Sequence, residues 1–145
     1  MGVKTALKDD EFKQLNKDRD IYSDFNHTFL PHPFTNQISR KTNVDSVKMA
    51  LRNLILTNKY ERLRNPDFGG NLRRYLFEPF DDDRIPEEIK QAIEELVELY
   101  EPRVRLLDVD VQSNEDLNAM NVRIQFSIIT SQTDESLDIT LYRVR

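Results

Sequence analysis

Two stretches of the chain repeat their apolar residues with the period of an amphipathic helix. The first runs from about Val44 to Thr57, and Asn43 suits the N-cap position before it. The second begins at Pro86, which suits a first helical turn, and ends near Tyr100 because Pro102 follows. The two apolar stripes contain Val44, Val47, Leu51, Leu54 and Ile55, then Ile89, Ala92, Ile93, Leu96, Val97 and Tyr100. The pattern therefore predicts two long helices with one buried face each.

After Pro102 the apolar period changes to two, which is typical of half-buried strands. Three segments alternate in this way: Leu107 to Val111, Met120 to Ile128 and Leu137 to Leu141. The loops between them are short and polar, which favours antiparallel neighbours. We expect an α+β fold with two main helices packed on an antiparallel sheet of three strands, or of four as the alternative. The edge strands would offer unpaired backbone groups to another chain.

The first 40 residues show neither period. Residues 1–20 are polar and charged, and we interpret them as an arm that precedes a single domain over residues 21–145. Residues 21–40 combine four aromatic side chains with Pro31 and Pro33, which exclude a regular helix there. We expect this segment to lie extended and to dock its rings into a surface.

The segment between the two helices contains turn-forming residues. Gly69 and Gly70 predict a turn, because glycine adopts positive φ without strain, and Phe68 should tuck in beside it. A short helix from about Asn71 to Phe77 follows. It would place three side chains inward, those of Leu72, Tyr75 and Leu76.

Composition narrows the classes of function. The chain has 145 residues, a net charge of -5 and no cysteine. One domain is expected at this length, and disulfides, thiolate metal sites and cysteine nucleophiles are excluded. The acidic balance does not favour nucleic acid as a partner. Neither a signal peptide nor an apolar run long enough to span a bilayer is evident, so a soluble cytoplasmic protein is the default interpretation.

The histidines and the carboxylates are the candidates for a metal site or a catalytic site. His27 and His32, near Asp24, lack a diagnostic spacing or a third ligand, so we predict no metal and no cofactor. Most acids fall on the polar face of the second helix or in a loop, where a solvated surface is the better account. A cell-wall hydrolase would need two facing carboxylates, and Glu78 with one of Asp81 to Asp83 is the candidate pair.

Basic and aromatic residues gather around the glycine turn. The set comprises Arg62, Arg64, Arg73 and Arg74 with Tyr60, Phe68 and Tyr75. Such a set suits single-stranded nucleic acid or an acidic protein surface. The net negative charge of the chain favours protein.

The stretch Tyr100-Glu101-Pro102-Arg103 lies where the second helix must hand over to the first strand. Proline fixes the exit direction, so Glu101 and Arg103 project to similar sides. Two interpretations remain open. The stretch is either a helix stop with two solvated charges or a rigid clamp for polar groups of another chain.

The chain resembles the baseplate wedge proteins that initiate the sheath of contractile tails, a family found in phages, type VI secretion systems and related injection machines. The resemblance covers about residues 20–145, and its first part rests on His32-Pro33, Val44-Asp45-Ser46-Val47 and Leu54-Ile55-Leu56-Thr57. It continues through Pro66-Asp67-Phe68-Gly69-Gly70-Asn71-Leu72 and Leu76-Phe77-Glu78 to Glu101-Pro102-Arg103, the hallmark triplet of the family. The polar first 20 residues are a departure from shorter members.

The resemblance implies a structural role without catalysis. It implies that Glu101, Pro102 and Arg103 contact the helical core bundle of neighbouring wedge proteins, and that the sheet edges accept strands from the tail sheath protein. The expected setting is a six-fold, hetero-oligomeric baseplate of a virion tail assembled in the host cytoplasm, or the cytoplasmic baseplate of a secretion or injection system. Neither membrane nor nucleic acid is an expected partner. The alternative hypothesis is a tail-associated, lysozyme-like cell-wall hydrolase.

Overall fold

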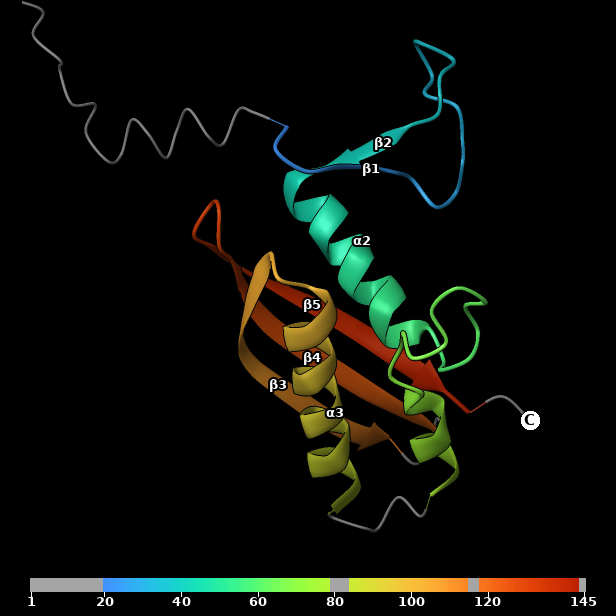
Figure 1. Cartoon of the computed structure of the whole chain (residues 1–145), viewed down its shortest axis with the longest axis vertical. Coiled ribbons are helices and arrows are strands. Elements are labelled where there is room, and N and C mark those ends of the chain that lie inside the picture. The colour runs from blue at the N-terminus through green and yellow to red at the C-terminus, as the bar shows by residue number, and fades with distance from the viewer. Residues whose placement is uncertain (1–19, 79–83, 115–117, 144–145) are drawn as a thin grey trace, which may run out of the picture. The chain divides into compact units, whose positions relative to one another are not determined.

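The computed structural model describes residues 20–78, 84–114 and 118–143 (Figure 1). Contacts divide the chain into a first unit that ends at Val47 and a second that runs from Lys48 to Arg145. Among the described residues no helix has the length and apolar character needed to cross a membrane. The predicted boundary at residue 20 stays a prediction, and the predicted arm lies almost wholly outside the described residues.

The first unit contains a small antiparallel hairpin that sequence patterns did not predict. Strands β1 (Ser23–Phe25) and β2 (Arg40–Thr42) pair with each other, and an isolated bridge joins Pro31 to Ile38. The expectation of an extended segment with docked rings is wrong for most of this stretch. Phe25, Phe29 and Phe34 are exposed, the last of them by 92%.

Helix α2 (Asn43–Leu56) lies within one residue of its predicted bounds at both ends. Asn43 has a positive φ of 47°, and its Oδ1 accepts a hydrogen bond from the Ile21 N–H at 2.9 Å. The residue therefore fastens the start of the hairpin as well as opening the helix. The predicted apolar stripe is buried, except that Val44 is only half-buried.

The second unit is built on a three-stranded antiparallel sheet in the order β3-β4-β5, as predicted. The strands are β3 (Val104–Asn114), β4 (Ala119–Ile128) and β5 (Thr133–Tyr142), and each extends beyond its predicted bounds. Helix α3 (Arg84–Tyr100) packs across the inner face of this sheet (Figure 1). The inward side chains of β4, with Phe126 and Ile124 fully buried, form the centre of the core.

A β-bulge in β3 corrects one part of the predicted alternation. The pairing with β4 shifts between Leu106 and Asp108, so Leu107 is an extra residue in its strand. Leu107 was expected to face the core, but 52% of it is exposed. Leu106, opposite the buried Phe126, takes the inward position instead.

The segment between α2 and α3 contains the short helix η1 (Leu72–Phe77), which is a 3₁₀ helix. Leu72, Tyr75 and Leu76 are buried, as predicted. An ion pair also joins α2 to the sheet, because Lys48 Nζ of α2 lies 2.8 Å from Glu135 Oε2 of β5. The helices thus cover one face of the sheet, while the opposite face keeps its polar side chains in solvent.

Candidate protein-binding site at the end of helix α3

The chain turns from α3 into β3 within three residues. The Glu101 N–H still donates to the Val97 carbonyl at 2.9 Å, but Pro102 has no N–H with which to continue the helix. The Val104 N–H then donates to the Glu101 carbonyl at 3.3 Å. Pro102 is exposed at the outside of this turn. These bonds fix the backbone of the triplet between the helix and the sheet.

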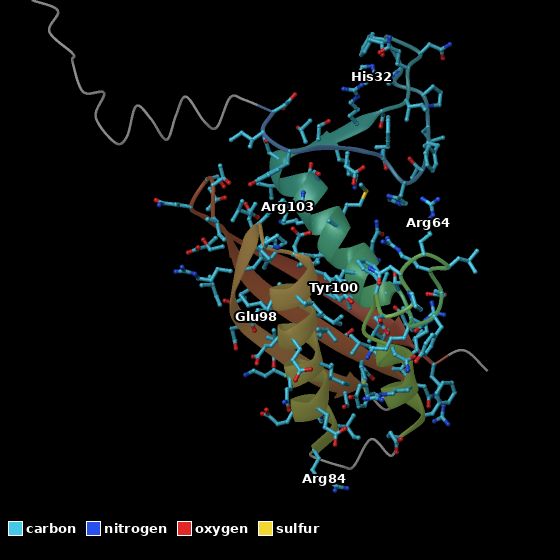
Figure 2. All side chains as sticks on the ribbon, viewed as in Figure 1. His32, Arg64, Arg84, Glu98, Tyr100 and Arg103 are labelled. Atoms are coloured by element: carbon cyan, nitrogen blue, oxygen red, sulfur yellow. The ribbon has the colours of Figure 1, made fainter. Side chains whose placement is uncertain are left out.

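Glu101 and Arg103 bind each other across the turn. Arg103 donates from Nε to Glu101 Oε1 at 2.5 Å and from Nη2 to Oε2 at 2.7 Å. Glu101 is only 6% exposed, whereas 31% of the Arg103 side chain is exposed. The Arg103 carbonyl also accepts a hydrogen bond from the Ile129 N–H at 3.0 Å, just beyond β4. The result is a bidentate ion pair at the corner where helix meets sheet, and Figure 2 labels Arg103 at this corner.

This geometry differs from the interpretation of two solvated charges. Glu101 is not solvated, because its carboxylate is buried against the guanidinium of Arg103, and contact of the triplet with another chain stays a prediction. Sequence spacing placed the two charges on one side of the turn but could not show that they satisfy each other. Pro102 and part of Arg103 are the portions of the triplet that reach the surface.

The glycine turn is attached to the same corner through aromatic rings. The rings of Phe68 and Tyr100 meet edge to face with centroids 5.1 Å apart, and the Arg62 guanidinium lies 3.8 Å from the centre of the Phe68 ring. Tyr100 directly precedes Glu101, so the loop braces the last turn of α3. Figure 2 shows Tyr100 and Arg103 toward this end of the helix, with Arg84 at the other end.

The predicted turn at the two glycines is confirmed. Gly69 has a φ of +106°, and a Cβ built on it would lie 2.3 Å from the Thr57 carbonyl oxygen. Gly69 is buried, and Phe68 is half-buried beside it. Only glycine fits both the backbone conformation and the close approach of the chain that leaves α2.

The arginines around this turn contact aromatic rings of their own chain. Arg74 donates from Nη2 to the Tyr75 hydroxyl at 2.6 Å, and this hydrogen bond raises the pKa of Arg74. Its guanidinium also lies 4.6 Å from the Tyr75 ring centre. Arg64 is exposed on the loop, where Figure 2 labels it. The interpretation of this cluster as a protein-binding surface stays a prediction.

The described histidines do not gather into a metal site. His32 Nδ1 accepts a hydrogen bond from the Phe34 N–H at 3.3 Å, and His27 is exposed. Within residues 20–78, 84–114 and 118–143, no three side chains of the metal-binding types come together. Glu78 is exposed, and its proposed partners Asp81 to Asp83 lie outside the described residues.

Comparison with known proteins decides the family. The model of the family described as baseplate wedge protein gp25 matches residues 41–133. The chain belongs to this family. The baseplate wedge protein gp25 of Enterobacteria phage T4 is 32% identical over 117 residues, which cover 79% of this chain and 85% of the phage protein. The family is one of structural proteins in the baseplate of contractile tails.

Solved structures share the gp25 family fold. A candidate tail lysozyme from Geobacter sulfurreducens superposes with a TM-score of 0.60 at 22% identity, over 68% of this chain and 89% of that one. A chain of the anti-feeding prophage baseplate gives 0.58 at 23% identity, over 83% of this chain and 84% of that one. A chain of the pyocin R2 baseplate gives 0.52 at 14% identity, over 85% and 100%. At these identities the likeness shows the fold alone.

Proposed function

We propose that this gp25 family member is a non-catalytic wedge component that binds the helical core bundle of neighbouring wedge subunits and initiates sheath assembly by strand addition. The observation that carries the first part is the fixed corner of Glu101, Pro102 and Arg103. Glu101 orients both Nε and Nη2 of Arg103, so the guanidinium is positioned before a partner arrives. Preorganisation of this kind lowers the ordering cost of binding.

The partner surface for this corner should present hydrogen-bond acceptors. A guanidinium held in one plane recognises carboxylates or backbone carbonyls with defined geometry. Helical bundles offer both, as acidic side chains and as the unpaired carbonyls of helix C-termini. The exposed Pro102 adds a rigid apolar contact beside the charge.

The second part of the proposal concerns the sheet. β3 and β5 are edge strands of a three-stranded sheet, and an extended segment of the sheath protein can add to such an edge through backbone hydrogen bonds. In a six-fold baseplate, several weak contacts act together and gain strength through multivalency. We place this assembly at the tail baseplate, built in the host cytoplasm, without membrane or nucleic-acid contacts.

Co-assembly tests this proposal directly. The purified chain is mixed with the wedge proteins and the sheath protein of the same tail, and complexes are examined by size-exclusion chromatography and electron microscopy. Entry into a wedge complex that seeds sheath rings is the expected result. A chain that stays alone with every wedge and sheath protein of its tail would overturn the proposal.

Arg103→Ala should weaken incorporation into the wedge by about tenfold, because a charged hydrogen-bonding group is lost at the contact. The matched control is Arg105→Ala, which removes an exposed arginine two residues further along the chain. Binding of each variant to the wedge subcomplex is measured by biolayer interferometry. Equal losses in both variants, or in neither, would remove Arg103 from the proposed contact.

A second candidate function, cell-wall hydrolysis, is raised by the name of the Geobacter sulfurreducens protein. Glu78 and the acids after it would have to supply the chemistry. We expect purified chain to leave a suspension of cell wall as turbid as buffer does. Clearing that is lost in Glu78→Gln would contradict the non-catalytic proposal.

A further inference from the structure

We infer that β5, rather than β3, is the edge that receives the added strand. We further infer that this strand carries basic side chains on one face and an apolar side chain on the other. The inference rests on the proposed strand addition and specifies its position and the chemistry of its partner. Three properties of the second unit support it: the direction of the free backbone groups, the charges along β5, and an apolar groove beside its end.

The hydrogen-bond pattern shows which backbone groups of β5 face outward. Paired residues of an antiparallel ladder alternate between hydrogen-bonded and non-hydrogen-bonded pairs. The Arg143 N–H donates to the Asn118 carbonyl at 3.0 Å, so this pair is a hydrogen-bonded one. Every second residue of β5 counted back from Arg143 therefore also pairs with β4 by hydrogen bonds, and the residues between them do not. Five residues consequently direct their N–H and C=O groups away from β4, namely Asp134, Ser136, Asp138, Thr140 and Tyr142. The pairing of β5 with β4 is unbroken from Thr133 to Tyr142, so these groups form a regular row.

The edge of β3 is less suited to a long added strand. The bulge at Leu107 interrupts the row of outward N–H and C=O groups on β3, because the pairing register with β4 differs on its two sides. Side chains of α3 also reach this edge, and Lys90 Nζ lies 3.8 Å from Asp108 Oδ1. Bulges, prolines and charged side chains, lysine above all, are features by which proteins protect an edge from strand addition. β5 carries aspartates, which a basic strand can pair with, but it has neither a bulge nor a proline or lysine.

The charges along β5 define one face of the partner strand. Asp134 and Asp138 lie four residues apart and are exposed on the outer face of the sheet. Arg123 of β4 donates from Nε to Asp138 Oδ1 at 2.7 Å, and this hydrogen bond raises the pKa of Arg123. A lysine or arginine beside each aspartate on the added strand would continue this cross-strand pattern.

An apolar groove defines the other face of the partner strand. A cavity of about 300 Å³ lies beside the C-terminal half of β5, and its mostly apolar lining consists of Leu56, Leu76, Phe77, Leu141 and Tyr142 with Arg73 and Thr140. The Phe77 side chain is 60% exposed. An inward-facing side chain beside Leu141 would enter this groove and cover part of the Phe77 surface.

These positions translate into a sequence pattern for the partner segment. Two basic residues lie four positions apart, opposite Asp134 and Asp138. An apolar residue lies three positions beyond the second, opposite Leu141, on the other face of the strand. The pattern reads in one direction for a parallel strand and in reverse for an antiparallel one. We expect it in an extended arm of the sheath protein.

A pair of serine-to-proline variants tests the choice of edge. Ser136→Pro removes an outward N–H from β5, and Ser113→Pro removes an outward N–H from β3, as the same alternation shows. Both serines are exposed, and neither N–H belongs to the ladder with β4, so both variants should fold. Folding is checked by circular dichroism. Sheath protein binding should fall roughly tenfold or more for Ser136→Pro and by less than about twofold for Ser113→Pro.

Synthetic peptides separate this inference from the proposed function. Two peptides carry lysines four positions apart. One has a leucine three positions after the second lysine, for a parallel strand, and the other has a leucine three positions before the first lysine, for an antiparallel strand; each has a control with glutamates in place of the lysines. We expect one of the two lysine peptides to bind at least about threefold more tightly than its control and to slow amide hydrogen exchange at Ser136, Asp138 and Thr140.

The outcomes differ for the two claims. If wild-type chain binds no sheath protein, strand addition of the sheath fails, and the peptides alone decide the edge. Protection of the outward β5 amides then supports the inference, whereas protection along β3, or none, overturns it. If sheath protein binds and only Ser113→Pro weakens it, the proposed function stands and the assignment to β5 is wrong.

Discussion

Glu101→Ala should lower the free energy of unfolding by about 2 kcal/mol while leaving the chain folded. The substitution removes the carboxylate that receives two hydrogen bonds from Arg103 and leaves a small void at a buried position. A fully buried ion pair broken in this way costs about 3–5 kcal/mol. The loss is smaller here because about a third of the Arg103 side chain is exposed and can be hydrated.

Urea denaturation followed by circular dichroism measures this loss. Glu98→Ala is the matched control, since Glu98 is an exposed glutamate of α3 only three residues earlier (Figure 2), and it should change stability by less than about 0.5 kcal/mol. A double-mutant cycle with Arg103→Ala isolates the energy of the pair. A coupling energy near zero would show that the two side chains do not support each other in solution.

The same variant separates the structural role of the triplet from its proposed binding role. Glu101 acts on a partner only through Arg103, because its own carboxylate is buried. Glu101→Ala should therefore weaken wedge incorporation by releasing the guanidinium of Arg103 from its fixed orientation. Complete unfolding of both Glu101→Ala and Arg103→Ala would instead make the triplet a purely structural helix stop.

Periodicity predicted most of the second unit because side-chain spacing is a direct consequence of backbone geometry. Ile89, Ile93 and Val97 are buried along α3 at helical spacing, and Val122, Ile124 and Phe126 are buried along β4 at strand spacing. Short loops then left an antiparallel meander as the favoured topology, and the structure has it.

Features that depend on pairing between segments could not be predicted in the same way. The bulge at Leu107 arises from the registers on either side of it, and the adjacent leucines Leu106 and Leu107 interrupt the alternation in sequence without showing which of them is the extra residue. The pairing of β1 with β2 joins three-residue segments separated by 14 residues, too short for a period to be visible. Both features depend on which segments pair and in which register, and local spacing alone does not specify that pairing.

The candidate site was predicted in its residues but not in its geometry. The position of Pro102 after a helix indicated a sharp turn, and the turn is there. The inward direction of Glu101 depends on the packing of α3 against β3, which sequence spacing does not specify. The groove beside Tyr142 has the same origin, since its walls come from α2, η1 and β5.

Gly69→Ala should be the most destabilising of the substitutions considered, with a loss of about 3 kcal/mol and a Tm lower by roughly 10 °C. Its φ of +106° lies where L-residues are strained, and the new Cβ would lie 2.3 Å from the Thr57 carbonyl oxygen. Backbone atoms cannot rotate away from such a contact, so the turn must shift. Phe68, which packs on Tyr100, would shift with it.

Gly70→Ala is the control, because it changes the neighbouring glycine to the same residue. Its Cβ would meet Leu96 Cδ1 at 2.5 Å, the end of a flexible side chain, and its φ is not in the positive region. The expected loss is therefore only about 1 kcal/mol, measured for both variants by thermal and urea unfolding. Equal losses would show that crowding, rather than the backbone conformation of Gly69, limits this turn. A larger loss for Gly69→Ala, together with weaker wedge incorporation, would show that the turn supports the corner at Glu101 through Phe68 and Tyr100.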